Sequence, residues 1–365
     1  MNKNHNLETW KEYVKKELHE VRTLIQHYGY TLADEQPHSM GERYVMRAMT
    51  TTSGEKLVLV GHDSHGTKVI IKTAHDTEGV RELEHERATK KTLKKIRFGY
   101  EIFKTPKELL HVMSDGRIVV IYEFIEQKKP FLTYSNEGQF YQSLGALKAQ
   151  EAAHATTHTH LKEIKSTFET FTSETYLTYI DEFYAVITTY NKSFTKTLDK
   201  IKTFFQENKT ICDQYGHFLT HVDFVPHNFR IAENGIYLLD FSSLRFGNKY
   251  EGWARFLNYM SLYNPTLEQW LVAYVEKNRT AEEHTSLKLM RLYRLLELIS
   301  FYIKTLEKAD TQLHTLNTAR IYFWFEVLQH VWNDTPLPEE IRNEYKQKRD
   351  SLRTDEERYR QEQLH

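Results

Sequence analysis

The stretch "HVDFVPHNF", which begins at His221, holds side chains whose types and spacing are suited to chemistry. Asp223 stands two residues after His221, and Asn228 follows five residues later. The apolar run "IYLLD" then ends on Asp240. Pro226 fixes one backbone angle of the loop, and "AENG" marks a tight turn before the apolar run. We therefore predict that a loop and a strand end present Asp223, Asn228 and Asp240 toward one point.

These side chains suit a magnesium site beside a reacting hydroxyl. Asn228 and Asp240 supply short oxygen ligands, one neutral and one charged, and Mg²⁺ takes such ligands together with water and substrate phosphates. Asp223 is then left to orient an attacking hydroxyl or to accept its proton. We expect His221, the other residue of the predicted catalytic loop, to be buried and to brace that loop.

The same residues resemble the catalytic and metal-binding segments of the aminoglycoside phosphotransferase and choline kinase family. That family's signature runs His-Gly-Asp-Leu-His-Pro-Gly-Asn and, later, Ile-Asp-Trp or Ile-Asp-Phe. The positions of this chain that fall on the first part of the signature are His221, Asp223, Pro226 and Asn228. Asp240 takes the place of the aspartate in the Asp-Phe-Gly motif of protein kinases. The resemblance implies a protein-kinase-like fold and transfer of the γ-phosphate of ATP or GTP.

Upstream residues match further parts of such a site in the correct order. Lys72, near the end of the apolar run "TKVIIKTA", matches the lysine that contacts the nucleotide phosphates. Glu86 matches the glutamate that pairs with this lysine, and Glu82, one turn earlier, is the alternative. "VVIYEFIE" resembles the hinge, which implies that main-chain groups of Glu123 and Ile125 bind the adenine.

The chain also departs from the family pattern at three places. Val222 and His227 replace two glycines of the signature, which makes the catalytic loop bulkier. The stretch "TTTSGE", residues 50–55, stands where a glycine-rich phosphate loop belongs. We expect its hydroxyls and amides to serve instead.

The elements that must position these residues follow from periodicity. Apolar residues from Leu7 to Tyr28 recur every three or four positions, which predicts an amphipathic helix ending near Gly29. The segments "RYVMRAM", "KLVLVGHD", "TKVIIKTA" and "GRIVVIYEFIEQ" read as strands, the last one opened by an Asp-Gly turn. A charged helix follows the third strand, with Thr77 as its expected N-cap.

The order of these elements predicts an α+β, two-lobed, protein-kinase-like architecture with a small β-rich lobe before a larger helical lobe. The expected divisions are an N-terminal helix packing on the first lobe (1–36), the N-lobe (37–126), a helical C-lobe (127–340) and a charged tail (341–365). About ten residues separate Asp240 from the next expected helix, too few for the long activation segment of a protein kinase. This spacing favours a small-molecule substrate.

The charge balance and the composition of the chain argue against some classes of binding partner. Forty-nine basic and fifty acidic side chains give a formal charge of −1, which argues against nucleic acid as the main partner. The single cysteine, Cys212, fits a reducing compartment, and no apolar run is long enough to span a bilayer. The opening residues lack the apolar core of a signal peptide. We therefore expect a cytoplasmic monomer or homodimer without a membrane partner.

The preferred interpretation is a magnesium-dependent kinase that phosphorylates a hydroxyl of a small molecule such as an aminoglycoside, an amino alcohol or a sugar. Two alternatives remain open: a pseudokinase that binds nucleotide without turnover, and a metal-dependent hydrolase using His221 and Asp223. A zinc site at His154 and His158 is disfavoured because no third ligand is evident. Acidic residues that could receive a cationic acceptor are Glu174, Asp181, Glu182, Glu268 and Glu297, and surface solvation explains them equally well.

Overall fold

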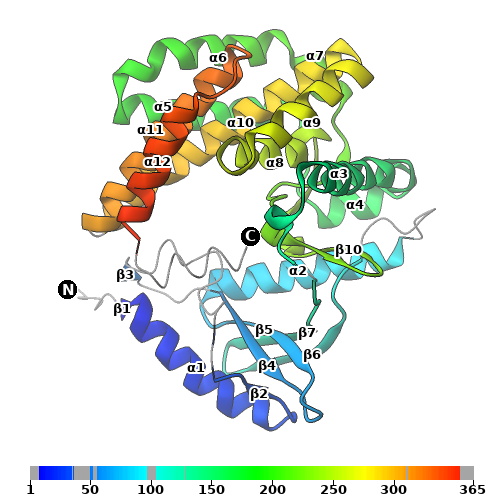
Figure 1. Cartoon of the computed structure of the whole chain (residues 1–365). Helices are drawn as coiled ribbons and strands as arrows, with labels where there is room; N and C mark the ends of the chain where they lie inside the picture. Colours follow the sequence, from blue (N-terminus) through cyan, green and yellow to red (C-terminus); the bar gives the residue numbers. More distant parts are fainter. Residues whose placement is uncertain are drawn as a thin grey trace, which may run out of the picture.

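The structure is a computed structural model that describes residues 8–34, 36, 50–51, 56–96, 104–127, 129–309 and 311–353. The strand predicted at "RYVMRAM" and most of the expected phosphate loop lie outside these residues. Figure 1 shows an N-terminal part built on a sheet and a mostly helical C-terminal part above it. This arrangement confirms the predicted α+β fold class.

A five-stranded antiparallel sheet forms the N-terminal part, in the order β2-β4-β5-β7-β6. Its strands are β2 (Thr31–Leu32), β4 (Leu57–His62), β5 (Lys68–Ala74), β6 (Glu108–Ser114) and β7 (Arg117–Glu123). A short separate pair joins β1 (Glu8–Thr9) to β3 (Thr50–Thr51). Three of the strands predicted from sequence correspond to β4, β5 and β7, whereas β6 was not predicted.

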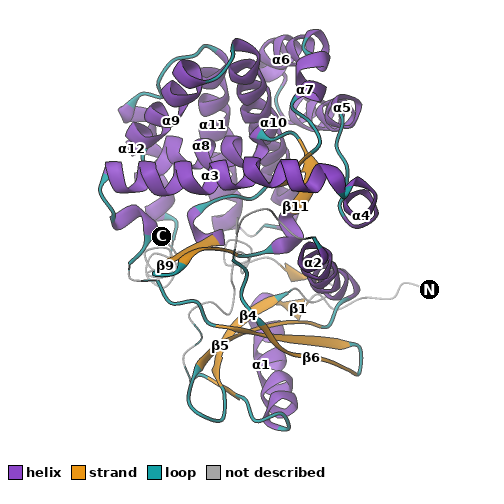
Figure 2. Cartoon of the chain, turned by 90° about the vertical axis from the view of Figure 1, so that its right-hand side faces the viewer, coloured by secondary structure: helices purple, strands orange, loops and turns teal. Residues whose placement is uncertain are grey.

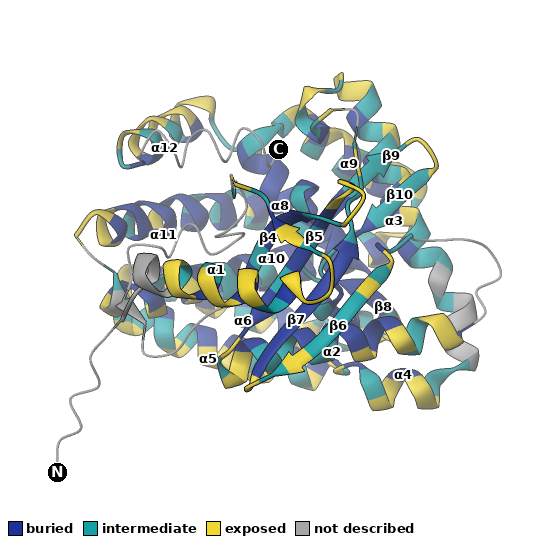
Figure 3. Cartoon of the chain, turned by 90° about the horizontal axis from the view of Figure 1, so that it is seen from below, coloured by how far each residue is buried: buried dark blue, intermediate teal, exposed yellow. Residues whose placement is uncertain are grey.

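Alternation along the strands sends apolar side chains to both faces of this sheet. Val119 and Ile121 pack with the buried residues of α1 (Trp10–Gln26), among them Ile25. Val120 and Tyr122 point to the opposite face, where Leu83 of α2 (Thr77–Lys95) covers them. Since successive side chains of a strand alternate, both faces need a covering helix, and the two helices supply it. Figure 3 shows α1 crossing the sheet on the side away from the helical part.

An ion pair fixes α1 to the sheet. Arg117, at the start of β7, is almost fully buried and bonds the carboxylates of Glu17 and Glu20 on α1, the latter at 2.8 Å. Burial opposes the charged form of Arg117, but the two carboxylates outweigh it and raise the pKa of the guanidinium. The N-terminal helix is therefore attached by charge as well as by its apolar stripe.

Helix α2 begins one residue earlier than the sequence suggested. Its N-cap is Asp76, whose side chain accepts a hydrogen bond of 2.9 Å from the Gly79 amide, so the prediction of Thr77 as N-cap was wrong. Aspartate is at least as good an N-cap as threonine, because its carboxylate also interacts favourably with the positive end of the helix. The helix lies between the sheet and the C-terminal part (Figure 2).

The C-terminal part is built from helices around one large hydrophobic core. Its helices are α3 (Asn136–Thr159), α4 (Leu161–Thr167), α5 (Ser173–Tyr190), α6 (Thr195–Glu207), α7 (Lys209–Gln214), α8 (Tyr250–Tyr263), α9 (Pro265–Asn278), α10 (Ala281–Thr305), α11 (Thr311–Trp332) and α12 (Glu339–Ser351). Helix α12 begins just before the expected 340/341 division, and its Tyr345 ring stacks on Phe323 of α11 with centroids 4.1 Å apart. The described part of the segment expected to be a tail is thus a packed helix.

Two short antiparallel strand pairs interrupt the helices, and the motif residues lie in or beside their connections. β8 (Phe218–His221) pairs with β11 (Leu244–Gly247), and β9 (Phe229–Ala232) pairs with β10 (Gly235–Leu238). The loop between β8 and β9 and the turn between β10 and β11 therefore lie next to each other. Among the described residues, no helix is long and apolar enough to cross a membrane.

Candidate active site

Lys72 and Glu86 form an ion pair between the sheet and α2. The Lys72 ammonium lies 2.7 Å from Glu86 Oε2, and the carboxylate is fully buried. Lys90, one turn further along α2, approaches the other carboxylate oxygen at 3.2 Å. Burial raises the pKa of Glu86, but the two lysines outweigh it and lower that pKa to about 2. Glu86 is therefore ionised, and it holds Lys72 at the edge of the cleft.

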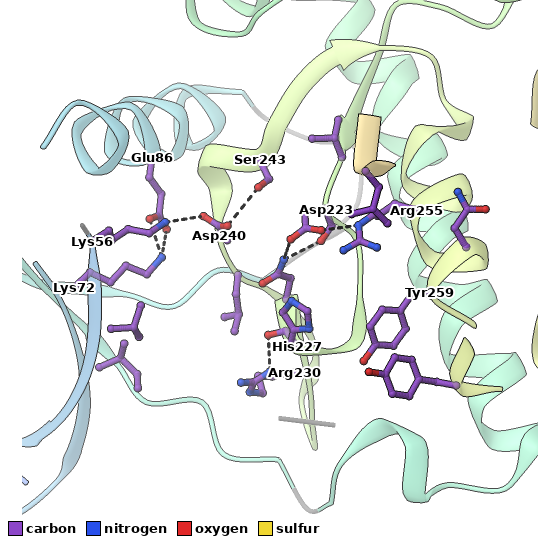
Figure 4. Close-up of a pocket in the computed structure, with 18 of the residues that line it drawn as sticks. Lys56, Lys72, Glu86, Asp223, His227, Arg230, Asp240, Ser243, Arg255 and Tyr259 are labelled. Atoms are coloured by element: carbon purple, nitrogen blue, oxygen red, sulfur yellow. Dashed lines mark hydrogen bonds and ion pairs between the residues drawn. The ribbon is translucent and has the colours of Figure 1, made fainter. Parts of the chain in front are cut away.

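Glu82, the alternative partner for Lys72, pairs instead with Lys56, which precedes β4. The Lys56 ammonium also lies 3.7 Å from Asp240 Oδ1, and it is nearly buried. Figure 4 shows Lys56 and Lys72 side by side, facing Asp240. Lys56 was not predicted from the sequence, since a single lysine before an apolar strand has no distinguishing local pattern.

Asp240 occupies a sharp turn that the sequence did not reveal. Its backbone is left-handed (φ 54°, ψ 62°), a conformation that non-glycine residues rarely adopt and that clusters at functional sites. Ser242 and Ser243 donate hydroxyl hydrogen bonds to its two carboxylate oxygens at 2.6 and 3.3 Å. Burial raises the pKa of Asp240, and Lys56 and Lys72 outweigh it, so the carboxyl stays ionised well below its usual pKa.

His221 is completely buried and contacts the backbone of the turn at Asp240. Its Nε2 lies 2.9 Å from the Leu239 carbonyl oxygen and 3.1 Å from that of Asp240, while its own amide donates to Gln150. These contacts tie the end of β8 to the turn after β10. In this arrangement the ring holds Asp240 in position and does not face the cleft.

Asp223 is bonded through both carboxylate oxygens. Arg255 on α8 donates from Nε to Oδ1 at 2.8 Å, and Asn228 donates from Nδ2 to Oδ2 at 2.9 Å. Burial raises the pKa of Asp223, but Arg255 outweighs it and brings that pKa to about 2. His227, the bulky replacement in the loop, has its pKa lowered to about 4 by burial, so its imidazole is neutral near pH 7.

Asn228 and Asp240 present the type of donor atoms that a magnesium ion takes. The Asn228 amide nitrogen makes both hydrogen bonds to Asp223, to its main-chain oxygen and its carboxylate, which directs the amide oxygen away from Asp223. The Asp240 carboxylate lines the same pocket. One neutral and one charged oxygen ligand fit Mg²⁺, which completes its shell with water and phosphate oxygens.

These residues line one pocket of about 950 Å³ between the sheet and the helices. Its apolar walls near the sheet include Val58 and Ile70. The predicted hinge residues Glu123 and Ile125 also line it, and the Glu123 amide donates to the Lys107 carbonyl at 3.0 Å. The pocket thus contains the residues predicted to bind nucleotide, metal and acceptor hydroxyl, namely Lys72, Glu86, Glu123, Ile125, Asp223, Asn228 and Asp240, whereas His221 is buried and does not line it.

The pocket also extends past Asp223 into a region that was not predicted from the sequence. Seven arginines of the C-terminal part line the pocket, and five of them come from α8, α10, α11, α12 and the residues just after α12: Arg255, Arg294, Arg320, Arg349 and Arg353. We call this region the arginine end of the pocket. Of the five acidic residues considered as acceptor ligands, Glu297 lines the pocket and is paired with Arg294 at 2.5 Å.

The other four acidic candidates lie elsewhere. Glu174 and Asp181 are exposed and pair with surface lysines, and Glu182 is exposed too. Glu268 is bound by Arg291 outside the pocket.

The disfavoured zinc pair finds no support in the described residues. His154 stacks on Phe218 with ring centroids 3.8 Å apart, and the side chain of His158 lies outside the described residues. Within the described ranges, no group of three or more His, Cys, Asp or Glu side chains is arranged to hold a metal ion. Any cation at Asn228 and Asp240 therefore needs further ligands from water or substrate.

No protein-family model matches the chain, and no curated protein matches it by sequence. Solved structures do match its fold. An aminoglycoside phosphotransferase, APH(4)-Ia, in a ternary complex with AMP-PNP and hygromycin B superposes with a TM-score of 0.57 at 14% identity, over 84% of this chain and 97% of that one. The chain has the fold of the antibiotic phosphotransferases.

Two further structures show the same likeness. Amicoumacin kinase hAmiN, in complex with AMP-PNP, Ca²⁺ and Ami, matches with a TM-score of 0.55 at 13% identity, over 89% of this chain and 97% of that one. The macrolide 2'-phosphotransferase MphH from Brachybacterium faecium matches with a TM-score of 0.51 at 13% identity, over 83% and 98% of the two chains. The resemblance found in the sequence is thereby confirmed at the level of the fold.

Proposed function

We propose that this protein is a magnesium-dependent kinase that transfers the γ-phosphate of ATP or GTP to a hydroxyl of a small molecule. The observation that carries the proposal is the convergence of the Lys72 and Glu86 pair, Asp240 and Asp223 on one pocket. Each is a residue that the sequence resemblance assigned to phosphoryl transfer. Solved neighbours of the same fold hold AMP-PNP, in one case with Ca²⁺, which supports nucleotide and a divalent cation as ligands here.

In this proposal each side chain has one task. Lys72, held by Glu86, contacts the nucleotide phosphates, and Lys56 supplies a second cation beside them. Main-chain groups of Glu123 and Ile125 receive the adenine. Mg²⁺ at Asn228 and Asp240 neutralises phosphate charge when it is bound.

Asp223 orients the acceptor hydroxyl. The hydroxyl oxygen forms a bond to the γ-phosphorus while the bond from that phosphorus to the bridging oxygen breaks, and ADP leaves with that oxygen. The hydroxyl proton passes to Asp223 and then to solvent. With a pKa of about 2 in the structure, Asp223 is a weak base, so alignment contributes more than proton abstraction.

The short connection after Asp240 favours a small acceptor over a protein. Only the single turn Phe241–Ser243 and β11 stand between Asp240 and α8, which begins at Tyr250. A protein kinase needs a long segment there to bind its peptide substrate. We place the enzyme in the cytoplasm, where nucleoside triphosphates are present and Cys212 stays reduced.

Replacing Asp223 with Asn tests the proposal. The wild-type protein with Mg-ATP and a panel of hydroxylated acceptors should release ADP in the presence of at least one of them. The Asp223→Asn variant should lose about 100-fold or more of that rate while still binding ATP. Asp199→Asn, at an exposed carboxylate bonded to Tyr184, is the matched control and should keep the rate. A variant as active as wild type would refute the assignment of Asp223.

The second candidate, a pseudokinase, is favoured by one observation. Both carboxylate oxygens of Asp223 already accept a hydrogen bond, one from Arg255 and one from Asn228. An acceptor hydroxyl therefore has to share an oxygen with one of these donors or displace that donor. Nucleotide binding without ADP release on any acceptor would support this candidate. ADP release that depends on Asp223 would exclude it.

A further inference from the structure

Arg230 is a charged side chain of the pocket that the proposed mechanism does not use. It is the second residue of β9, it lines the pocket, and it stands two positions after Asn228. Its Nη1 donates to the main-chain oxygens of His227 and Phe229 at 3.0 and 2.9 Å. These bonds attach one corner of the guanidinium to the loop that carries Asn228.

The Arg230 guanidinium has no carboxylate partner in the part of the chain that the structure describes. Lys72 and Arg255, two other cations of the pocket, are each paired with a carboxylate. Burial lowers the pKa of Arg230 to about 10, so the half-buried side chain is still charged near pH 7. Nε and Nη2 bond no other described residue, and neither nitrogen is enclosed by protein. A positive charge with open donors therefore lines the pocket.

One wall of the pocket is the face of the sheet that carries Lys72. Val58 and Ile70 lie on this face, because Val58 pairs with Lys72 and Ile70 stands two residues before Lys72 on the same strand. Ile70 in turn pairs with Tyr122, the residue before Glu123 of the predicted hinge. This wall thus runs from the proposed phosphate contact, through apolar side chains, to the hinge.

The opposite wall belongs to the C-terminal part. It carries Asn228 and Asp240, the proposed metal ligands, and next to them Arg230 and Leu239. The Leu239 amide donates to the Asn228 main-chain oxygen at 2.8 Å, so these two segments lie side by side. Arg230 and Leu239 are therefore the next side chains on this wall after the proposed metal ligands.

Backbone pairing connects Arg230 to the hinge side of the pocket. Arg230 pairs with Tyr237 between β9 and β10, and Tyr237 forms a bridge with Lys104. Two residues after Lys104, Pro106 lines the pocket, and the next residue accepts a hydrogen bond from the Glu123 amide. The segment that contacts the hinge is thus the same segment that extends the strand pair of Arg230.

We infer that Arg230 binds the base of the nucleotide, with its planar guanidinium stacked on the purine ring, an assignment that rests on the proposed kinase function. A guanidinium stacks on aromatic rings and is attracted by their π electrons, more strongly where water is excluded. Val58 and Ile70, on the opposite wall, offer apolar contact to the other face of the ring. Arg230 is then a nucleotide-binding residue in addition to those predicted from the sequence.

A phosphate group is the other nucleotide component that suits a guanidinium. The cations placed for phosphate, Lys56 and Lys72, lie together and face Asp240 (Figure 4). In the same view Arg230 lies apart from them, beyond His227. These positions favour the base over the phosphates, and the two contacts predict different losses when Arg230 is replaced.

Calorimetric titration without Mg²⁺ separates the two contacts. The probes are ADP or GDP, whichever the wild type binds more tightly, and the nucleoside that corresponds to it. Arg230→Gln should weaken the diphosphate and the nucleoside by the same factor, about 5- to 30-fold, as expected for loss of a partly buried cation–π contact. A loss confined to the diphosphate would mean that the guanidinium contacts phosphate, and it overturns the assignment to the base.

NMR of the arginine side chains reports stacking in the wild-type protein. The Nε–H resonance of Arg230 is assigned as the signal that is missing from Arg230→Lys. Saturation with the diphosphate should move this resonance upfield, because the ring current of a stacked base shields a proton above it. A resonance that stays in place or moves downfield overturns the assignment. This measurement also decides the question where the nucleoside binds too weakly for calorimetry.

Two controls separate a base contact from support of the loop. Arg342→Gln is matched to Arg230→Gln, since Arg342 also donates to a main-chain oxygen, that of Leu337, but does not line the pocket; it should bind nucleotide as the wild type does. The factor by which Mg²⁺ strengthens ATP binding should be equal in Arg230→Gln and wild type. A smaller factor would mean that the substitution has displaced Asn228, and the wild-type NMR shift then decides.

The outcomes keep the two proposals apart. Nucleotide and nucleoside binding unchanged in a folded Arg230→Gln, with folding checked by thermal melting, overturns the role of Arg230 and leaves the kinase proposal standing. Failure of the wild-type protein to bind either diphosphate overturns the kinase proposal itself.

Discussion

At the scale of single residues, the site depends on buried charges that neutralise one another. Glu86 is enclosed by Lys72 and Lys90, and Asp223 is enclosed by Arg255 and Asn228. Ionised groups are costly to bury unless they are paired, so each carboxylate keeps its cations in fixed positions. The positions that a nucleotide would need are therefore set before it binds.

Glu86→Gln should disable this arrangement in two ways. Lys72 and Lys90 lose their shared counter-charge, so ADP release should fall about 100-fold or more. The pKa of Glu86 is about 2 in the folded protein and near 4.5 in the unfolded chain, so the ionised carboxylate stabilises the folded state by about 3 kcal/mol at pH values above 4.5. This contribution disappears as the pH falls through 2.

Urea unfolding at pH 7 and pH 4 checks the pH-dependent stabilisation by Glu86. The free energy of unfolding of Glu86→Gln should lie closer to that of the wild type at pH 4 than at pH 7, since at pH 4 the wild type has begun to lose the stabilisation from the ionised Glu86. Glu78→Gln, at an exposed position of the same helix, is the control and should match wild type at both values. An equal deficit at the two pH values would show that Glu86 does not titrate as described.

Arg255→Gln should raise the pKa of Asp223. Burial favours the neutral carboxyl and Arg255 is the principal group that opposes it, so removal of the cation should move the pKa from about 2 toward or above the ordinary aspartate value of 3.8. An NMR titration of protein labelled with ¹³C at the aspartate carboxyl carbons measures this shift directly. A signal that titrates at the same pH in both proteins would contradict the pairing.

At the scale of elements, local patterns predicted much of the fold. The apolar stripe predicted α1, alternating apolar residues predicted β4, β5 and β7, and the spacing from Asp223 to Asp240 marked the loop and the strand end of the site. Strand β6 was missed because its seven residues include exposed leucine and methionine beside a histidine, so their alternation is weak. Local propensity also could not decide whether Asp76 or Thr77 is the N-cap of α2.

The arginine end could not be predicted as a unit, because its members come from helices far apart in the sequence. Three of the four helices, α8, α11 and α12, nevertheless carry a local trace of it. An arginine and an aromatic residue recur four positions apart on one face, as in Arg255 with Tyr259, Arg320 with Trp324, and Tyr345 with Arg349. Only the packing of α8, α10, α11 and α12 shows that these faces meet at one pocket.

The apolar contact of α1 with the sheet gives a prediction at this scale. Ile25 is fully buried against the sheet, so Ile25→Ala should lower the free energy of unfolding by about 2–5 kcal/mol. Tyr28→Ala, at a position 48% exposed, should change it by less than about 1 kcal/mol. Chemical denaturation monitored by circular dichroism compares the two. A tolerated Ile25→Ala would mean that α1 does not stabilise the sheet.

At the scale of the whole molecule, the pocket joins the two parts of the chain. The sheet and α2 contribute Lys56, Lys72 and Glu86, and the C-terminal part contributes Asp223 and Asp240 (Figure 4). A nucleotide in this pocket would touch both parts at once. In the proposed function a magnesium ion is held at Asn228 and Asp240, and the assignment of the pocket depends on that ion.

Calorimetric titration of ATP into wild type and Asp240→Asn, each with and without Mg²⁺, tests the central claim most directly. Asparagine tolerates the left-handed backbone of this turn, so the variant should keep the fold and lose the negative charge that is proposed to hold the metal. We predict that Mg²⁺ strengthens ATP binding at least tenfold in wild type and has little effect in the variant. Equal gains in both proteins, or no ATP binding by wild type, would contradict the account.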